Sequence, residues 1–594
     1  MNRGSDVRTV SGMFCIVLAT LVAGALVHLA RNLRRVQVDS VGDYNYAASV
    51  QSVRRVQTAG IRGRILDRRG EILADNRRAL SIACDPIFFQ AKTWAGTVEA
   101  MSNAIARAGR VIGIEANVSE RTIRRHVNQA LALPLTVWRD IGQDVEARFC
   151  EHGAEMAGFR LVETAERSYP FGSLAAHALG FVGRVEAASE AGDEKFAFRE
   201  QELYGREGLE RYYDGFLRGM PGEAKILVDA RGFAIREWSV VSAQKGPDLR
   251  LALDARVQRA AEEQLEGVKG ACVVMDPRNG EVLALASSPT FDLRTCVPIL
   301  RAGTYEHLAK DETKPLLNRA TGGAYAPGST FKPITALAGL SHGLSAGELY
   351  SCTGAYRLGD LVLRCAARWG HGELDLEHAL MKSCNPYFCN LGVSLGTNAV
   401  ISAARAFGLG EKCGIDLFAD FAGVVPDGEW KRRTYGEPWY PGDLAQMSIG
   451  QGMLMVSPVQ MARIAGALGT GYLVTPHLKL DAPFERRRLP FDGRHLALVR
   501  KGMRMVVAGD GGARGGGHAA GAGVGVAVAG KTGTAEVGQG ATRRKNTWFI
   551  GYAPAERPTV AVALVVENGE SGGETAAPRV GAVLRTIFGG GGEA

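Results

Sequence analysis

The chain has 594 residues, 46% of them hydrophobic and 22% charged, as expected of a globular protein large enough for several domains. Its net charge of +8 is mild for this length, and it has no arginine-rich arm and no basic stripe with interleaved aromatic residues, so nucleic acid is not a favoured partner. It also contains no C-x-x-C pair, no G-x-x-x-x-G-K-[ST] loop and no H-E-x-x-H motif.

The N-terminal segment from Thr9 to Ala30 contains no Asp, Glu, Lys or Arg, and a helix of this length spans about 30 Å of hydrocarbon. Basic residues flank it on both sides, so charge does not decide its orientation: Arg3, Arg8, Arg31, Arg34 and Arg35. A cleaved signal peptide is the alternative, but the apolar run is long and no clear A-x-A site follows. We expect residues 1–35 to form a cytoplasmic tip and a transmembrane anchor.

Residues 36–247 change pattern several times. A polar, partly helical stalk is expected up to about residue 60, followed by a hairpin that turns at residues 67–70. Residues 95–160 have a mostly helical period, and residues 224–253 alternate like strands.

From about residue 248 the pattern becomes more regular. An amphipathic helix is expected at 255–267, then a hairpin around Asn279-Gly280 and mainly helices from 330 to 470. The strand-like run GVGVAVAG precedes Lys531, two more strands are expected at 547–554 and 559–568, and a last helix at 577–588. The glycine-rich stretch 509–524 is interpreted as a flexible loop, because a phosphate cradle would need a following helix. The order predicts an α+β fold, with a sheet covered by helices.

Ser329 and Lys332 lie in the string GGAYAPGSTFKPITALAGL, where a turn runs into a helical pattern. Residues three apart at a helix start share a face, so the lysine amine can reach the serine oxygen. A serine hydroxyl needs an adjacent base to act as a nucleophile. Because an unperturbed lysine has a pKa near 10.4, lowering it to about 7 takes roughly 4–5 kcal/mol. Burial and a second cation are the larger contributions, since a helix N-terminus supplies only about 0.3–1 kcal/mol.

Two further motifs follow in order: Ser383-Cys384-Asn385 and Lys531-Thr532-Gly533-Thr534. A lone S-x-x-K motif is weak, but the three together are the mark of penicillin-binding proteins and serine β-lactamases. Lys531 is the candidate second cation near Lys332. Asn385 could instead be a turn-capping residue before Pro386.

The chain resembles class B penicillin-binding proteins over nearly its whole length, and most of all the elongation-type transpeptidase, penicillin-binding protein 2. The septal transpeptidase is the nearest competitor. The resemblance is carried by these strings: RGRILDRRG, RSYPFG, GLERYYD, KPLLNRAT, GHGELDLEHALMKSCNPYF and EWKRRTYGEPWYPGDLAQMSIGQG.

This resemblance implies an anchor (1–35), an elongated pedestal or dimerisation-like domain (36–247) and a β-lactamase-like transpeptidase domain (248–594). It implies a single-pass protein of the cytoplasmic (inner) membrane with its catalytic domain outside the cytoplasm. The implied activity is D,D-transpeptidation of peptidoglycan stem peptides during cell-wall elongation, through a serine acyl-enzyme that β-lactams also form. The implied partners are a SEDS-type glycan polymerase and rod-shape scaffold proteins.

The resemblance also implies the role of each site residue. Ser329 is the nucleophile, Lys332 the proton acceptor and Ser383 the relay to the leaving nitrogen. Asn385 binds the substrate amide, and Lys531, Thr532 and Thr534 hold the substrate's terminal carboxylate along a strand edge, where Gly533 permits close approach. The backbone N–H groups of Ser329 and Thr534 would form the oxyanion hole.

Three cysteines and a histidine fall within 33 residues: Cys352, Cys365, His371 and Cys384. Three thiols and one imidazole can form a closed tetrahedral zinc site, and some penicillin-binding protein 2 relatives bind zinc with a similarly placed set. A Cys352–Cys365 disulfide and simple buried thiols are the alternatives. The acyl transfer itself requires no cofactor.

Two other kinds of function use the same motifs. A β-lactamase or D,D-carboxypeptidase would hydrolyse the acyl-enzyme rapidly, but such chains are usually shorter and lack a pedestal. A β-lactam sensor or inactive scaffold would bind without turnover; the intact Ser329, Lys332 and Lys531 argue against the scaffold but not against the sensor.

Overall fold

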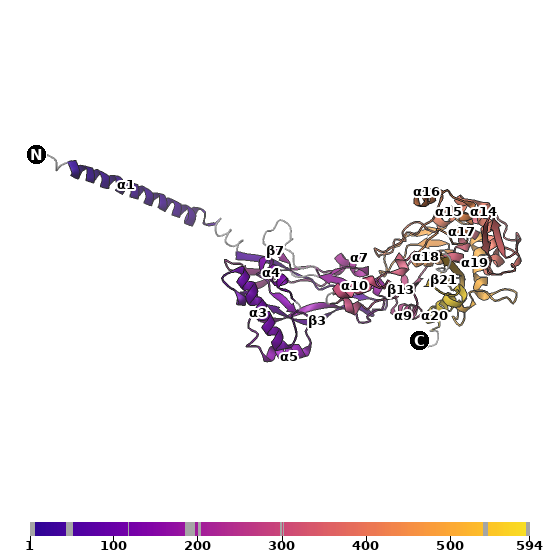
Figure 1. Ribbon diagram of the computed structural model, residues 1–594, viewed down its shortest axis with the longest axis horizontal. Coiled ribbons are helices and arrows are strands. Elements are labelled where there is room, and N and C mark those ends of the chain that lie inside the picture. The colour runs from indigo at the N-terminus through magenta and orange to yellow at the C-terminus, as the bar shows by residue number, and fades with distance from the viewer. Residues whose placement is uncertain are drawn as a thin grey trace.

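The computed structural model describes residues 6–42, 52–116, 118–184, 197–199, 203–297, 300, 302–538 and 544–589. Helix α1 (Asp6–Arg34) continues into the short π-helix η1 (Arg35–Asp39) and projects away from the rest of the chain (Figure 1). Gly12–Asp39 contains an 18-residue stretch with a mean hydropathy of 2.4 and no buried residue. It is the one helix in the described ranges long and apolar enough to cross a membrane, and it includes most of the predicted anchor.

The described part of the pedestal contains two larger sheets and the two-stranded sheet β6–β8. The first larger sheet has the order β10-β9-β1-β7 and the second the order β11-β2-β3-β4, with β5 also paired to β3. The predicted hairpin is confirmed, because β2 pairs antiparallel with β3 and Gly70 adopts a φ of 91° in the turn. The strand bounds are β1 Val53–Thr58, β2 Ile65–Leu66, β3 Ile72–Cys84, β4 Leu135–Trp138, β5 Phe159–Ser168, β7 Ala197–Arg199, β9 Gly222–Val228, β10 Ala234–Val241 and β11 Leu249–Arg250.

The expected helices at 95–160 are present, but they are interrupted by strand β4. Apolar faces of α3 and α4 pack on this sheet in a core that includes Ile82, Met101 and Val127. The prediction of a polar, partly helical stalk up to about residue 60 was partly wrong, because residues 53–58 form β1. Residues 43–51 lie outside the described ranges. The remaining elements of this region are η2 Pro86–Phe89, α3 Trp94–Ile112, α4 Glu120–Gln129, α5 Gln143–Glu151, α6 Ala176–Leu179, β6 Val182–Arg184, β8 Leu203–Gly205, α7 Gly208–Tyr212 and α8 Asp214–Leu217.

A buried ion network joins three separate pedestal segments. The Glu210 carboxylate accepts hydrogen bonds from Arg62 Nε at 2.6 Å and Arg167 Nε at 2.7 Å. These side chains are 0–2% exposed. They come from RGRILDRRG, RSYPFG and GLERYYD, so three of the strings that carry the resemblance meet at one point.

The C-terminal domain is built on a five-stranded antiparallel sheet in the order β13-β12-β22-β21-β20, as the α+β prediction required. Along β12, Val273 and Met275 face one apolar core while Cys272 and Val274 face another, because successive side chains in a strand point to opposite faces. The strands are β12 Gly270–Met275, β13 Val282–Ser288, β20 Ala529–Val537, β21 Arg544–Ala553 and β22 Val560–Glu567.

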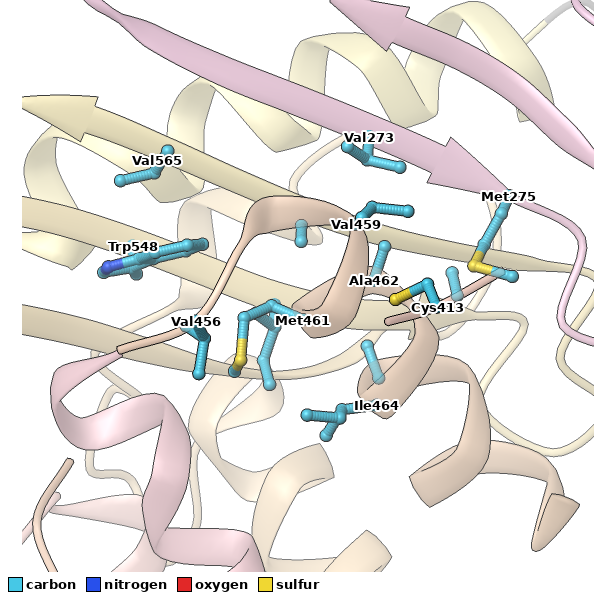
Figure 2. Packing of buried hydrophobic residues seen from close by; sticks show 14 of the residues in the cluster. Val273, Met275, Cys413, Val456, Val459, Met461, Ala462, Ile464, Trp548 and Val565 are labelled. Atoms are coloured by element: carbon cyan, nitrogen blue, oxygen red, sulfur yellow. The ribbon is translucent and has the colours of Figure 1, made fainter. Parts of the chain in front are cut away.

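Helices cover both faces of this sheet. Helices α9 (Ala255–Glu263) and α20 (Ala577–Phe588) pack on one face, which confirms both predicted helices. Helix α18 (Pro458–Thr470) packs on the other face, where Figure 2 shows Val459 and Ala462 among side chains of β12 and Trp548. Residues next to the three predicted motifs, Phe331, Cys384 and Ala529, belong to the same core as α18.

The expected helical region from 330 to 470 contains helices but also two small two-stranded sheets, β14–β17 and β15–β16. Their strands are too short for an alternating pattern to stand out in the sequence. The strands are β14 Tyr350–Cys352, β15 Ala355–Leu358, β16 Leu361–Arg364 and β17 Gly372–Leu374. The helices are α12 Lys332–Ser341, α13 Leu376–Met381, α14 Asn385–Leu395, α15 Thr397–Ala406, α16 Gly428–Tyr435, α17 Pro441–Met447 and α18.

The strand predicted for the run GVGVAVAG, just before Lys531, was placed too early. Strand β20 begins at Ala529, and the preceding residues form turns in which Gly523 and Gly525 have positive φ. The stretch 509–524 consists of turns and the short helix η5, in keeping with the predicted loop. The other elements are η3 Leu293–Cys296, α10 Ala302–Lys310, α11 Arg319–Gly322, η4 Gly328–Phe331, β18 Tyr472–Val474, β19 Arg486–Arg488, α19 Gly493–Ala508, η5 His518–Ala520 and η7 Gly572–Ala576.

Candidate active site

Ser329 lies in the single-turn 3-10 helix η4, directly before α12, which starts at Lys332. Gly328 supplies a φ of 56° at the entrance to this turn, and Pro333 occupies the first turn of α12, where its missing N–H costs nothing. Ser329 itself is half-buried, unlike its neighbours Gly328 and Thr330, which are buried.

Distant parts of the chain hold the turn that carries Ser329. The Gly328 N–H donates to the Gly450 carbonyl at 2.7 Å, and a Cβ on Gly450 would lie 2.0 Å from the Gly328 carbonyl oxygen. Trp548 Nε1 of β21 donates to the Ala326 carbonyl at 3.0 Å. The turn is thus fixed from two sides, and the sequence reasoning had not identified Gly450 or Trp548 as contributors.

The Lys332 ammonium is completely buried and faces the second motif. Its Nζ donates to Asn385 Oδ1 at 2.7 Å, to the Ser383 carbonyl at 2.7 Å and to Ser383 Oγ at 3.3 Å. It also lies 5.7 Å from the centre of the Phe388 ring. Burial lowers the pKa of Lys332 to about 8. A useful fraction of this amine is therefore neutral near physiological pH.

Ser383 and Asn385 occupy the tight connection between α13 and α14. Ser383 has a φ of 55°, an uncommon conformation for a residue with a side chain, and Asn385 begins α14. The amide of Asn385 accepts from Lys332 and donates from Nδ2 to the Arg364 carbonyl at 2.8 Å. These are not capping bonds, so the turn-capping alternative for Asn385 was wrong.

Lys531 lies on β20 and, like Lys332, contacts the Ser383 hydroxyl. Its Nζ donates to Ser383 Oγ at 2.9 Å and to the Thr532 carbonyl at 2.9 Å. The side chain is fully buried, and burial, followed by repulsion from the Lys332 charge, lowers its pKa well below the usual value. Two amines therefore converge on one hydroxyl.

The KTG segment lies on β20, the edge strand of the five-stranded sheet. A Cβ on Gly533 would lie 2.9 Å from Thr330 Cγ2, and a Cβ on Gly328 would lie 2.8 Å from the Thr534 carbonyl oxygen. Thr532 and Thr534 are half-buried, unlike Lys531. The three predicted motifs therefore meet. Within the KTG segment, the partly exposed groups are Thr532 and Thr534.

Cys352, Cys365, His371 and Cys384 also come together. Their possible ligand atoms all lie within 4.8 Å of one another, and Cys365 Sγ is 3.4 Å from His371 Nδ1. All ten cysteines fall within the described residues and all are free thiols, so a Cys352–Cys365 disulfide is not formed there. A hydrogen bond from the Cys384 thiol lowers the pKa of Cys365 to about 4. The cluster lies beside the site, because Cys384 separates Ser383 from Asn385.

Comparison with known proteins agrees with this geometry. Residues 57–251 match the Penicillin-binding Protein dimerisation domain, and residues 270–585 match the Penicillin binding protein transpeptidase domain. The peptidoglycan D,D-transpeptidase MrdA of Acinetobacter baumannii is 31% identical, with 94% of this chain and 84% of the relative covered.

Solved structures give the same result. In a complex between PBP2 and MreC from Helicobacter pylori, a chain that is 26% identical aligns with a TM-score of 0.76 over 91% of this chain and 99% of its own. A chain from a peptidoglycan synthase complex is 27% identical and aligns with a TM-score of 0.70 over 98% of this chain and 99% of its own. The resemblance to elongation-type, class B members is confirmed, and the chain belongs to the penicillin-binding protein transpeptidase family.

Proposed function

We propose that this chain is the peptidoglycan D,D-transpeptidase of cell-wall elongation and that Ser329 is its nucleophile. The observation that carries the proposal is the convergence of two buried amines, from Lys332 and Lys531, on the Ser383 hydroxyl, with the half-buried Ser329 in the turn directly before Lys332. The named D,D-transpeptidase relative, aligned over nearly the whole chain, supports the choice of reaction and substrate.

Acylation uses these residues in sequence. Ser329 Oγ attacks the carbonyl carbon between the two terminal D-alanines, and its proton passes to the neutral Lys332 amine. The backbone N–H groups of Ser329 and Thr534 stabilise the oxyanion. Ser383, hydrogen-bonded to Lys332, passes a proton to the leaving nitrogen, the C–N bond breaks and D-alanine departs.

Deacylation reverses the same proton path. The amine of a neighbouring stem peptide attacks the acyl carbon, loses its proton through Ser383 and Lys332, and releases Ser329 as the cross-link forms. Before reaction the substrate extends along the open edge of β20, and Thr532 and Thr534 hold its terminal carboxylate. Lys531 is buried against Ser383, so its charge acts on this carboxylate at a distance while the two threonines contact it. The same charge disfavours protonation of Lys332.

We also propose that the Cys/His cluster holds a structural zinc ion. Three sulfurs and one imidazole nitrogen within 4.8 Å of one another fit a tetrahedral site, where Zn–S bonds are about 2.3 Å long. With all four ligands supplied by the protein, such an ion would stabilise the fold and would have no open position for a substrate. The chain's contribution is positional: Cys384 fixes the connection that presents Ser383 and Asn385 to Lys332.

Metal analysis tests the zinc site. Purified wild-type protein should contain about one zinc per chain, and His371→Ala should lose it and melt several degrees lower. His152→Ala, at a half-exposed pedestal histidine, is the matched control and should keep the metal. Zinc-free wild-type protein with fully titratable thiols would contradict the proposal.

The N-terminal helix, the pedestal and the relatives together suggest the setting of the enzyme. We propose a single-pass protein of the cytoplasmic membrane with the pedestal (36–247) and the transpeptidase domain (248–594) outside the cytoplasm. The proposed partners are a SEDS-type glycan polymerase and a rod-shape scaffold protein. One structural neighbour was solved with MreC, and another comes from a complex that coordinates polymerization and crosslinking.

Intact-mass analysis after exposure to penicillin tests the central proposal. One adduct per chain, mapped to Ser329 and persistent over many minutes, is the expected result, and Ser329→Ala should take up none. Rapid loss of the adduct would instead indicate a β-lactamase. A stable adduct on any other residue would overturn the assignment of Ser329.

A further inference from the structure

Trp369 stands almost entirely in solvent, with an exposed fraction of 87%. Among the described residues 361–374 it is the one large apolar side chain that is so exposed. It lies on the loop between Cys365 and His371, five residues after Arg364, whose carbonyl accepts a hydrogen bond from Asn385 Nδ2. A side chain in this position contributes nothing to core packing, so its role depends on what approaches from outside.

The backbone that carries Trp369 is held in one shape. Gly370 adopts a φ of 87°, and a Cβ there would lie 2.0 Å from the Cys352 carbonyl oxygen. A Cβ on Gly354 would lie 2.5 Å from the Arg368 carbonyl oxygen, so the two glycines pack the loop tightly against β14 and its turn. The Gly370 N–H also donates to the Ala367 carbonyl at 3.0 Å. The exposed ring is thus presented by a fixed loop, which reduces the entropy lost on binding.

This loop is continuous with the active site. Strand β16 ends at Arg364, whose carbonyl accepts the hydrogen bond from Asn385 Nδ2. The Arg364 and Arg368 side chains are exposed. The Arg368 guanidinium lies 5.2 Å from the centre of the Trp369 ring. A ligand that extends beyond Asn385 therefore meets two cationic groups and one aromatic face.

We infer that Arg364, Arg368 and Trp369 form a subsite for the glycan strand of the peptidoglycan substrate. This inference rests on the proposed function and extends it, because it assigns the enzyme a polymeric substrate whose sugar rings are bound as well as its stem peptide. An indole ring has a negative face that attracts the polarised C–H bonds of a pyranose ring, and guanidinium groups bind the carboxylates of stem peptides.

The surroundings of Trp369 favour a sugar over a protein partner. Protein-binding hot spots are aromatic residues that lie in well-packed pockets and become fully desolvated. Trp369 instead is 87% exposed, next in the chain to the exposed Arg368 and five residues after the exposed Arg364. A single ring with a charged neighbour suits a hydrophilic polymer that must move on after each cross-link.

Binding of glycan strands stripped of their stem peptides tests the inference on the full-length protein. Trp369→Ala should weaken the affinity for these strands by about five- to tenfold, and Trp369→Phe should retain most of it. Trp238→Ala, which removes a half-exposed tryptophan from pedestal strand β10, is the matched control and should bind as the wild type does. Unchanged affinity in Trp369→Ala would overturn the inference, as would a loss seen with free stem peptide and not with bare strands.

Penicillin labelling of Ser329 separates this inference from the proposed function. A wild-type protein that takes up no label contradicts the transpeptidase itself, whereas normal labelling with no effect of Trp369 contradicts only the glycan subsite. If Trp369→Ala fails to fold, the difference in tryptophan emission between wild type and Trp369→Phe gives a second measurement. Bare strands should change this difference, and an unchanged difference would overturn the inference.

Discussion

The pedestal and the candidate active site both bury cationic side chains, but the groups that accept hydrogen bonds from those side chains differ. In the pedestal, Arg62 and Arg167 share the Glu210 carboxylate, and all three side chains are 0–2% exposed. In the candidate active site, Lys332 and Lys531 are equally buried, yet within the described residues their hydrogen bonds go to hydroxyl, amide and carbonyl oxygens and not to a carboxylate.

The pKa values follow from this difference. Burial alone would lower the pKa of Arg62, but the charges of Glu210 and Asp214 more than offset it and the pKa rises. Burial lowers the pKa of Lys332 to about 8, and burial together with Lys332 lowers that of Lys531. A buried cation with a counter-charge joins segments of the fold, whereas a buried amine without one becomes a base.

The largest effect on acylation is expected when the Lys332 amine, which has no carboxylate partner, is removed. Lys332→Met should reduce the rate of penicillin acylation by about 10³–10⁴-fold, because Ser329 loses its proton acceptor. The melting temperature should stay the same or rise, since an apolar side chain of similar length replaces a buried charge without a carboxylate partner. Stopped-flow acylation and calorimetry check the two parts. A large fall in melting temperature would show that Lys332 is structural, as Arg62 is.

The opposite pattern is expected in the pedestal. Glu210→Gln leaves the buried Arg167 guanidinium without its counter-charge and leaves Arg62 paired with Asp214 alone, so it should destabilise the protein by about 3–5 kcal/mol. Below the melting temperature, acylation should change little, because Ser329 and Lys332 are untouched. Thermal unfolding provides the measurement. Glu223→Gln, which removes the half-buried partner of the exposed Arg55, is the control and should cost about 0–1 kcal/mol.

A smaller effect is expected from the hydroxyl that the two lysines share. Ser383→Ala should slow acylation by about 10²-fold, since Lys332 loses its path to the leaving nitrogen but remains the base for Ser329. Ser394→Ala removes a hydroxyl on α14, the helix that follows Ser383, where it donates to the Leu391 carbonyl; this variant should be acylated at a rate within about twofold of wild type. Equal rates for the two variants would show that Ser383 has no part in the proton path.

The sequence was informative where local chemistry decides the structure. The Asn279-Gly280 turn predicted the β12–β13 hairpin, and the turn running into a helical pattern predicted the start of α12 at Lys332, although Ser329 lies in the preceding 3-10 helix η4. The grouping of three cysteines and a histidine predicted a cluster that the fold brings together. In these cases the relevant residues are close in the chain or chemically distinctive.

Features that depend on distant contacts could not be read in this way. Gly450 and Trp548 hold the Ser329 turn from more than 100 residues away, and no local pattern connects them to it. The full burial of Lys531 depends on how β20 meets the α13–α14 connection, so the lysine looked like an accessible carboxylate ligand. Strands β14 to β17 are defined by their pairing partners more than by their own short sequences.

The pH dependence of penicillin acylation tests the account most directly. Only the neutral amine of Lys332 accepts the Ser329 proton, so the rate should rise about tenfold per pH unit below the pKa of about 8 and level off above it. The profile should be absent in Lys332→Met. A wild-type rate that is flat between pH 6 and 9, or that keeps rising to above pH 10, would contradict the claim that burial without a counter-charge prepares this lysine as the base.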